Sequence, residues 1–375
     1  MFEEWYLNDL ITKEIKDTWK QVDYYLLQLI FLIIEDSGID SLLKVGTTPE
    51  EIVNKKQYIK NSKNAIKWML DRLVIDSFLI IKDDIYYLTD KKPDYDLDYI
   101  VKMTEKIASK STIAFKMLKL MADNYIDFFE GKKSGVDIMF SYQSELIIEY
   151  YSDNLFYNVH NILGAKILNY DIEKREKPVI LEVGGGLGGG TKQFVTQRMD
   201  NGLPPNNFEY IFTDIANKML RYTKKALNIT DYNLQSFSFR KLDFNVSLAE
   251  QGFEENSIDV IWGVNALHVA YNLEWTLKEL KKVLKSGGSL IISETVRPIG
   301  NRMIQQEFLL NTLPDYYNVK LDPEIRPQAG FMDWKYWINA LKFCDFDNVE
   351  TIPNMTILEK EYDNCYVAVI RGIKK

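Results

Sequence analysis

The sequence has few of the residues that bind metal ions or form covalent cross-links. Only two cysteines, Cys344 and Cys365, and two histidines, His160 and His268, occur among its 375 residues. Two cysteines cannot build a disulfide framework, and two histidines provide too few nitrogen ligands for a zinc site. The composition therefore predicts a cytoplasmic protein that works without a metal ion.

Positive charge and long apolar runs are also scarce. The 46 lysine and arginine residues are outnumbered by 54 aspartate and glutamate residues, which gives a net charge of -8 and makes nucleic acid a minority hypothesis. The longest apolar run, Tyr24 to Ile34, is interrupted by Gln28 and is too short to span a bilayer. Glu3 and Glu4 stand where a signal peptide would be basic, so we expect neither export nor a membrane segment.

Residues 1–98 have the pattern of helices followed by one hairpin. Helical periodicity or a helix start signal begins near Asp9, Thr48 and Asn61. Strand patterns at Phe78–Ile81 and Ile85–Thr89 then flank a short turn. This order of elements predicts a winged-helix domain.

The charge of this region argues against the usual role of a winged helix. Residues 1–98 hold 19 acidic and 13 basic residues, and the expected recognition helix offers only Lys63, Lys67 and Arg72. A ligand-responsive DNA-binding regulator is therefore the alternative rather than the main hypothesis. We expect a homodimer instead, because the run Tyr24–Ile34 has more apolar surface than one small domain can cover.

Residues 99–170 predict a helical linker or lid, and residues 171–375 a second domain. In that domain apolar strand patterns alternate with helices, which is typical of a parallel sheet with helices on both faces. The fold class expected is α/β, with a Rossmann-like, seven-stranded domain behind the α-helical winged-helix domain. The seven strands are expected at Val179–Val183, Tyr210–Thr213, Phe237–Leu242, Ile258–Val264, Ser289–Glu294, Asn348–Ile352 and Tyr366–Arg371.

A glycine-rich turn follows the first of these strands. Gly184, Gly186 and Gly188 lie between the strand and the next helix, and their missing side chains would let a ligand lie against the backbone. Gly184, Gly186 and Gly189 also match the dinucleotide fingerprint, so an oxidoreductase that uses NAD is an alternative.

Acidic and aromatic residues at the ends of successive strands favour S-adenosylmethionine over NAD. Glu182 would repel a pyrophosphate but not the cationic amino-acid part of S-adenosylmethionine. Asp214 is placed to accept hydrogen bonds from ribose hydroxyls. Asp243 can accept one from an adenine amino group, while Phe244 packs on the ring.

Six segments resemble, in order and spacing, the class I S-adenosylmethionine-dependent methyltransferases of polyketide and peptide natural-product assembly. The likeness extends from Tyr150 to Glu294. Independently, a winged-helix domain joined in front of this fold resembles small-molecule O-methyltransferases. The segments are Leu181–Gly189, Phe212–Ile215, Leu242–Phe244, Glu250–Phe253, Asn265–His268 and Leu284–Gly288.

The resemblance implies S-adenosylmethionine as cofactor, S-adenosylhomocysteine as product, and a small-molecule or carrier-tethered substrate. The cofactor residues implied are Glu182, Gly184, Gly186, Gly188, Asp214, Asp243, Phe244 and Asn265.

The resemblance also implies a catalytic pair. His268 follows the fourth strand at the carboxyl edge of the sheet, where ligands of open α/β folds bind, and matches the general base of the family. Glu294 ends the neighbouring fifth strand and resembles the acid that orients this base. The alternatives are a solvent-facing loop histidine and a strand-end acid that caps the next segment.

Two further residues are candidates for the substrate site. His160-Asn161 corresponds to a tyrosine-asparagine pair of the family, and this departure leaves His160 open between a packing role and a pocket role. Arg326 lies in a segment that resembles the border of the acceptor site, where it could hold a carboxylate or a phosphopantetheine phosphate. A surface arginine is the alternative.

The function expected is methylation of a small natural-product intermediate at oxygen, with His268 as general base. C-methylation of a β-ketoacyl thioester uses the same motifs and stays open. The segment Asn265–His268 is not the Asn/Asp-Pro-Pro-aromatic run of enzymes that methylate amino groups of nucleic acids. We therefore expect no nucleic-acid partner.

Overall fold

A computed structural model of the chain divides into two compact units, each assembled from segments that are distant in the sequence. Unit 1 comprises Met1–Thr12, Phe156–Arg302 and Asn318–Lys375, and unit 2 comprises Lys13–Leu155 and Met303–Tyr317. The sequence ranges 1–98, 99–170 and 171–375 stay a prediction. The structure describes residues 2–93, 96–140, 144–152, 154–173, 175–204, 207–229 and 234–375.

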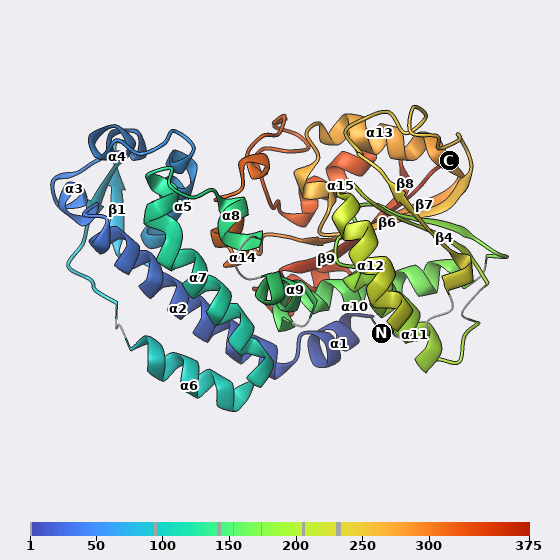
Figure 1. Cartoon of the computed structure of the whole chain (residues 1–375), viewed down its shortest axis with the longest axis horizontal. Coiled ribbons are helices and arrows are strands. Elements are labelled where there is room, and N and C mark those ends of the chain that lie inside the picture. The colour runs from blue at the N-terminus through green and yellow to red at the C-terminus, as the bar shows by residue number, and fades with distance from the viewer. Residues whose placement is uncertain are drawn as a thin grey trace. The chain divides into compact units, whose positions relative to one another are not determined.

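Unit 1 is built on a seven-stranded sheet with the order β5-β4-β3-β6-β7-β9-β8 (Figure 1). Neighbours are parallel from β5 to β7, and β9 pairs antiparallel with both β7 and β8. A strand was expected at each of these places, so the α/β class and the seven-stranded sheet are confirmed. The strands are β3 (Val179–Glu182), β4 (Glu209–Asp214), β5 (Phe237–Lys241), β6 (Ile258–Val264), β7 (Leu284–Thr295), β8 (Asp347–Ile352) and β9 (Val367–Ile373).

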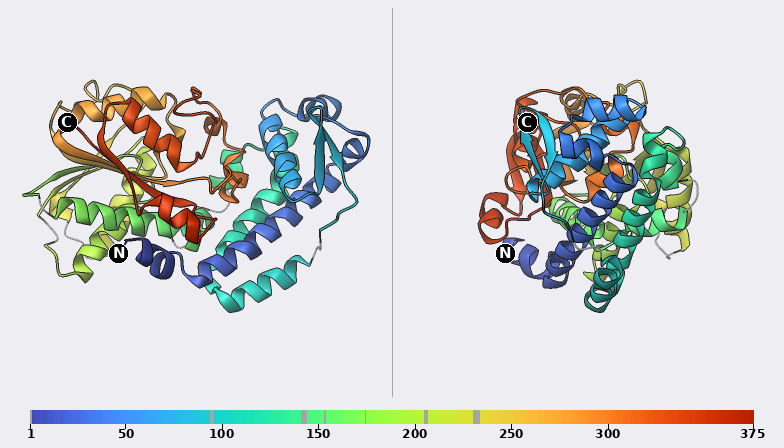
Figure 2. Two further views of the ribbon diagram at one scale, coloured as in Figure 1. Left: turned by 180° about the vertical axis from the view of Figure 1, so that it is seen from behind. Right: turned by 90° about the vertical axis from the view of Figure 1, so that its left-hand side faces the viewer.

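Helices cover both faces of this sheet, with α13 and α15 on one face and α10 and α11 on the other (Figures 1 and 2). Apolar residues of the inner strands, such as Ile261 and Ile291, are fully buried between these layers. The helices of unit 1 are α1 (Phe2–Trp5), α10 (Leu155–Ile172), α11 (Gly189–Asp200), α12 (Asn217–Ile229), α13 (Leu273–Val283), α15 (Trp334–Phe343) and α16 (Met355–Glu361).

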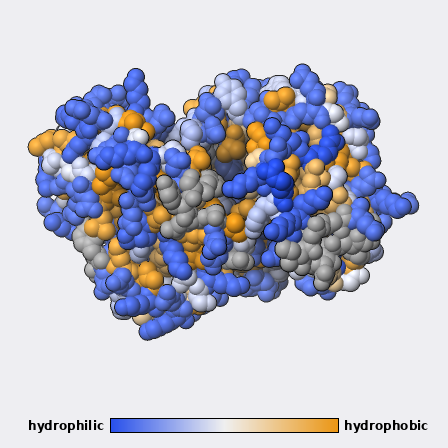
Figure 3. All heavy atoms as spheres, viewed as in Figure 1, coloured by the Kyte–Doolittle hydropathy of each residue, from blue (hydrophilic) through white to orange (hydrophobic). Residues whose placement is uncertain are grey.

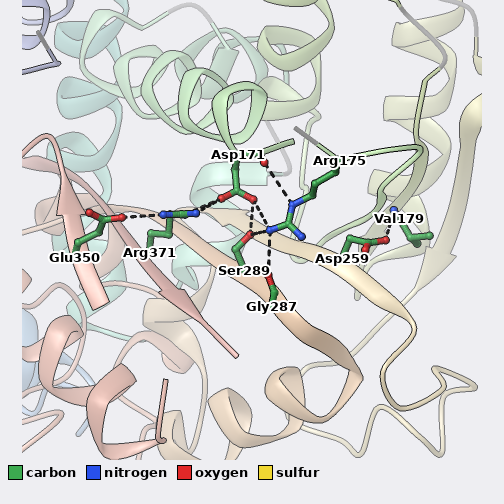
Figure 4. A network of polar contacts seen from close by, with 8 residues as sticks. All are labelled: Asp171, Arg175, Val179, Asp259, Gly287, Ser289, Glu350 and Arg371. Carbon is green, nitrogen blue, oxygen red and sulfur yellow. Dashed lines mark hydrogen bonds and ion pairs between the residues drawn. The ribbon is translucent and has the colours of Figure 1, made fainter. Parts of the chain in front are cut away.

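A buried ionic network fixes the end of α10 to the sheet (Figure 4). Asp171 of α10 accepts hydrogen bonds from Arg371 of β9 at 2.7 Å and from Ser289 of β7. Arg175, which follows α10, donates to the same carboxylate at 3.1 Å, and Arg371 also pairs with Glu350 of β8 at 2.8 Å. A carboxylate this deeply buried is tolerated only with such partners. The position of α10 over the sheet is thereby set.

Unit 2 is mostly helical and carries the two-stranded hairpin expected from the sequence, with Leu79 opposite Leu88. Thr48 accepts a hydrogen bond from the backbone of Glu51 at 3.2 Å, as its expected place at the start of a helix requires. The winged-helix dimerisation domain itself is not confirmed. The elements are α2 (Lys13–Asp36), α3 (Asp40–Val45), α4 (Pro49–Lys56), α5 (Ser62–Ile75), β1 (Leu79–Lys82), β2 (Ile85–Leu88), α6 (Leu97–Ile107), α7 (Thr112–Phe129), α8 (Gly135–Phe140), α9 (Ser144–Ser152) and α14 (Gln306–Leu310).

The apolar side chains of α2 are covered within the chain itself. Leu26, Ile30 and Phe31 are at most 3% exposed, and α2 packs against α5, α6 and α7. Most of this cover comes from residues beyond 98, so a second copy is not needed to bury the helix.

On the face drawn in Figure 3, apolar and hydrophilic side chains are intermingled. No helix in the described part of the chain is long and apolar enough to cross a membrane.

Candidate active site

The turn between β3 and α11 exposes backbone that a ligand can approach. Gly184, Gly186 and Gly188 have φ values of +64°, +53° and +76°, a region that side chains disfavour. A Cβ atom on Gly184 would lie 2.7 Å from the Cβ of Ala266. A Cβ on Gly186 would meet only the carbonyl oxygen of Gly184, at 4.0 Å, so the space beside this glycine is open.

Asp214 ties the end of β4 to this turn. Its Oδ2 accepts a hydrogen bond from the backbone N–H of Gly186 at 2.9 Å, and its Oδ1 accepts one from Ala216 at 2.8 Å. Each carboxylate oxygen has a second lone pair, so both can still accept from a ligand hydroxyl. The acid expected at the ribose thus lies directly against the glycine turn.

Asp243 and Phe244 follow β5 at the same edge of the sheet. The Cε1 atom of Phe244 is 3.8 Å from the position that a Cβ on Gly184 would take, so the ring borders the turn. Asp243 is half-buried, and its Oδ1 accepts from the backbone of Asn245 at 2.9 Å. Gln251 holds this segment with two hydrogen bonds to the main chain of Asp243, both at 2.8 Å. That role of Gln251 was not foreseen from the sequence.

Glu182 lies beneath the turn rather than at its surface. It is 1% exposed and accepts hydrogen bonds from the hydroxyl of Thr191 and, at 2.8 Å, from Tyr210. Burial raises the pKa of the Glu182 carboxyl to about 7, against an ordinary value of 4.5. Neither Thr191 nor Tyr210 was singled out from the sequence, because only the fold shows that they surround this acid.

These residues fit S-adenosylmethionine. The open glycine backbone can lie against the ligand, Asp214 and Asp243 are acceptors suited to neutral hydroxyl and amino groups, and Phe244 offers a ring face. Which residue binds which part of the cofactor stays a prediction.

The structure brings His268 and Glu294 together at the ends of the adjacent strands β6 and β7. Nδ1 of His268 is 2.9 Å from Oε2 of Glu294, and both side chains are buried. The other oxygen, Oε1, accepts the backbone N–H groups of Ala266, Leu267 and His268 at 3.1, 2.9 and 3.2 Å. An ionised carboxylate can only accept, so the tautomer that matches this contact carries its proton on Nδ1 and a lone pair on Nε2.

Asn265 closes the turn between β6 and His268. It has φ +48°, its N–H donates to the carbonyl of Ser293 at 2.8 Å, and its Oδ1 accepts the N–H of Thr295 at 2.7 Å. Two residues that flank Glu294 on β7 are thus bonded to the turn that leads to His268. The cofactor contact expected of Asn265 stays a prediction.

Arg326 lies behind the same turn. It is 1% exposed and donates hydrogen bonds to the carbonyl oxygens of His268 and Ala270. The ring of Phe331 packs on His268, with the ring centres 4.7 Å apart. A guanidinium in this place holds the segment that carries His268, and its expected contact with an anionic substrate stays a prediction.

His160 lies on α10 and is completely buried. Its Nε2 is 3.1 Å from Oγ1 of Thr295, while Oγ of Ser293 donates to its backbone carbonyl at 2.9 Å. Burial lowers the pKa of the His160 imidazole to about 3, and nearby His268 adds to this shift, so His160 is neutral at physiological pH. Its expected contact with substrate stays a prediction.

Comparison with known proteins identifies the domain that holds this site. Residues 181–292 match the methyltransferase domain family. Over 240 residues the chain is 28% identical to the highly reducing polyketide synthase ACRTS2 of Alternaria alternata, and over 209 residues 31% identical to the lovastatin diketide synthase of Aspergillus terreus. These alignments cover 63% and 55% of this chain but 9% and 8% of the synthases. The chain therefore spans a tenth or less of these relatives.

Solved structures share the fold over nearly the whole chain. The CurJ carbon methyltransferase has a TM-score of 0.80 at 20% identity, covering 96% of this chain and 92% of that one. The CMeT domain of the citrinin polyketide synthase has a TM-score of 0.77 at 16% identity, covering 98% and 90%. The trans-methyltransferase CalH, solved with S-adenosylhomocysteine, has a TM-score of 0.66 at 19% identity, covering 96% and 92%. The chain therefore contains a methyltransferase domain, which includes residues 181–292.

Proposed function

We propose that the chain methylates the carbon between the two carbonyl groups of a β-ketoacyl thioester held on a carrier arm. Its sequence relatives are polyketide synthases, and the structures named CurJ and citrinin CMeT are described as carbon methyltransferases or CMeT domains. These likenesses support carbon as the acceptor in place of the oxygen expected from the sequence.

The observation that carries the proposal is how Glu294 is bonded. Three backbone donors hold one of its oxygens, and the other holds Nδ1 of His268 at 2.9 Å. The imidazole is therefore fixed in orientation and tautomer, and Nε2 is left as a base. Such a preset base needs no rearrangement before it removes a proton.

The acceptor chemistry suits a base held in this position. The carbon between a ketone and a thioester is acidic, because the negative charge left after proton loss spreads onto two oxygens. In the proposed step, Nε2 of His268 takes the proton and the carbon forms a bond to the methyl carbon. S-adenosylmethionine, when bound, supplies that methyl group, with the sulfur keeping the bonding electron pair.

The decisive experiment locates the transferred methyl group. The chain would be incubated with a ¹³C-methyl donor and a β-ketoacyl pantetheine thioester, and the product analysed by ¹³C NMR. We expect a methyl carbon bonded to carbon. A methoxy signal would instead show that oxygen is the acceptor, and free hydroxy acids and phenols serve as matched competing substrates.

A parallel measurement tests whether the acceptor must be a thioester. The same acyl group would be offered as a free acid, as a pantetheine thioester and on an acyl carrier protein. We expect turnover only with the two thioesters, because the free acid loses the thioester carbonyl that stabilises the carbanion. Equal turnover of the free acid would contradict the proposed acceptor class.

A further inference from the structure

His160 and the catalytic pair meet at the end of β7. Glu294 lies between Ser293 and Thr295, and both neighbours contact His160. Ser293 donates to its backbone carbonyl at 2.9 Å, and Oγ1 of Thr295 is 3.1 Å from its Nε2. Since side chains alternate along a strand, these neighbours face α10 while Glu294 faces the other way.

The same strand end is bonded to the turn that carries His268. The N–H of Thr295 donates to Oδ1 of Asn265 at 2.7 Å, and the N–H of Asn265 donates to the carbonyl of Ser293 at 2.8 Å. A continuous path of hydrogen bonds therefore leads from His160 through Thr295 to Asn265, three residues before His268. Glu294 completes the path with its bonds to the backbone of the same turn.

Packing alone does not account for an imidazole at position 160. Among the described residues Nδ1 of His160 has no hydrogen-bond partner, although the side chain is completely buried. Burying an unpaired nitrogen destabilises a fold, so a residue that only filled space would serve better as phenylalanine or leucine. The polar contact that the ring does make is the one from Nε2 to Thr295.

The helix that carries His160, α10, is held firmly against the sheet. A Cβ on Gly164, one turn along α10, would be 3.0 Å from the Cβ of Ser293, so helix and strand are in close contact there. At its far end α10 is fixed by the ionic network around Asp171 (Figure 4). A hydrogen bond from such a helix can hold a strand end in place.

We propose that His160 is a positioning residue: through its Nε2 contact with Thr295 it holds the end of β7, and so fixes Glu294 and the turn that carries His268. The inference rests on the proposed function, in which His268 and Glu294 move the proton. His160 does not exchange a proton itself, because it stays neutral through physiological pH.

A spectroscopic test needs neither substrate nor cofactor. The chain has only two histidines, so ¹⁵N-histidine labelling gives two imidazoles, each assigned by mutating the other. We expect Thr295→Val, which removes the hydroxyl but keeps the shape, to shift the ring signals of both His160 and His268. Ser293→Ala is the matched control on the same strand, and we expect it to leave the His268 signals in place. Unmoved His268 signals in Thr295→Val would overturn the proposal.

Kinetics with matched variants separate positioning from packing. The amide of glutamine reaches about as far as Nε2, and that of asparagine only as far as Nδ1, so His160→Gln should keep turnover and His160→Asn should lose it. A small displacement of a catalytic group costs about 10- to 100-fold in kcat. We expect such a loss in His160→Asn and Thr295→Val, with Thr295→Ser near wild type and the Kd of S-adenosylhomocysteine unchanged throughout.

The outcomes distinguish this proposal from the one on which it rests. Equal kcat in His160→Gln and His160→Asn, whether both high or both low, would show that the Nε2 contact has no positioning role. If the double variant His160→Asn/Thr295→Val loses no more than either single variant, the two residues act through one contact. Full turnover in His268→Ala would instead contradict the proposed base, whatever the NMR spectra show.

Discussion

The two sides of the active site are built in opposite ways. At the glycine turn, where we propose that the donor binds, the groups offered to a ligand are partly open, because Gly186 borders free space and the oxygens of Asp214 keep lone pairs. At the end of β7 both oxygens of Glu294 are bonded within the protein and no part of that residue is exposed. This proposed donor side thus has room for a ligand, and the proposed catalytic side, at the end of β7, holds one imidazole still.

The largest expected effect on turnover comes from replacing Glu294, which holds Nδ1 of His268. In Glu294→Gln the side-chain oxygen must take the place of Oε1, because three backbone N–H groups need an acceptor there. The NH₂ group then faces Nδ1 of His268, which must become the acceptor, and the proton moves to Nε2. We expect kcat to fall by about 10²–10⁴, the scale of losing a general base through the wrong tautomer.

Single-turnover rates and calorimetry check this prediction together. The Kd of S-adenosylhomocysteine should be unchanged in Glu294→Gln, because only the catalytic side is altered. A variant that turns over like the wild type would mean that Glu294 does not select the tautomer of His268.

A smaller effect, on ligand affinity, is expected from a change at the glycine turn. Asp214→Ala removes the acceptor expected to meet the ribose and also frees the N–H of Gly186. We expect the binding of S-adenosylhomocysteine to weaken by about 1–3 kcal/mol, the scale of a buried hydrogen bond left unmade. Isothermal calorimetry measures it, with Glu209→Ala at the exposed start of the same strand as control. Unchanged affinity in Asp214→Ala would remove this acid from the cofactor site.

The two sides also predict opposite responses of stability to pH. The pKa of Glu182 on the donor side is raised to about 7, so the folded state binds more protons than the unfolded state between about pH 4.5 and 7, and stability falls as pH rises. The pKa of His160 is lowered to about 3, so below pH 6.5 the unfolded state binds more protons and stability falls as pH falls. Between pH 5 and 7 each of these two groups changes the free energy of unfolding by about 2 kcal/mol. The two changes have opposite signs, so in the wild type they nearly cancel.

Urea unfolding of two variants separates these contributions. We expect His160→Gln to be more stable at pH 5 than at pH 7, because the contribution of Glu182 is no longer offset by that of His160. Glu182→Gln should show the reverse order. If both variants follow the wild-type dependence on pH, neither group is titrating with the shift that its burial implies.

The sequence predicted the seven strands of unit 1 because each is a local apolar pattern with a turn behind it. It did not predict that Met303–Tyr317 belongs to unit 2, since no local pattern tells which unit a segment after β7 will join. The expected homodimer rested on covering α2, and the cover comes from α6 and α7 of the same chain. Long-range packing of this kind has no signature in a short stretch of sequence.

The residues of the candidate site also fall into those that the sequence predicted and those that it did not. Glycines, strand-end acids and His268 stand in recognisable spacing, and the structure brings His268 and Glu294 together. The residues that hold them are single polar residues without a recognisable motif: the partners of Thr191 and Gln251 lie 9 and 8 residues away along the chain, and the partner of Thr295 lies 135 residues away. Their roles follow from the register of neighbouring strands and from the path of α10, which only the folded structure supplies.

The most direct test of the account compares wild type and His268→Ala in single turnover with a β-ketoacyl thioester and a ¹³C-methyl donor. We predict that the wild type forms a new carbon–carbon bond. His268→Ala should be about 10²–10⁴-fold slower, while its Kd for S-adenosylhomocysteine stays that of the wild type. A full single-turnover rate in His268→Ala on the same acceptor would contradict the account.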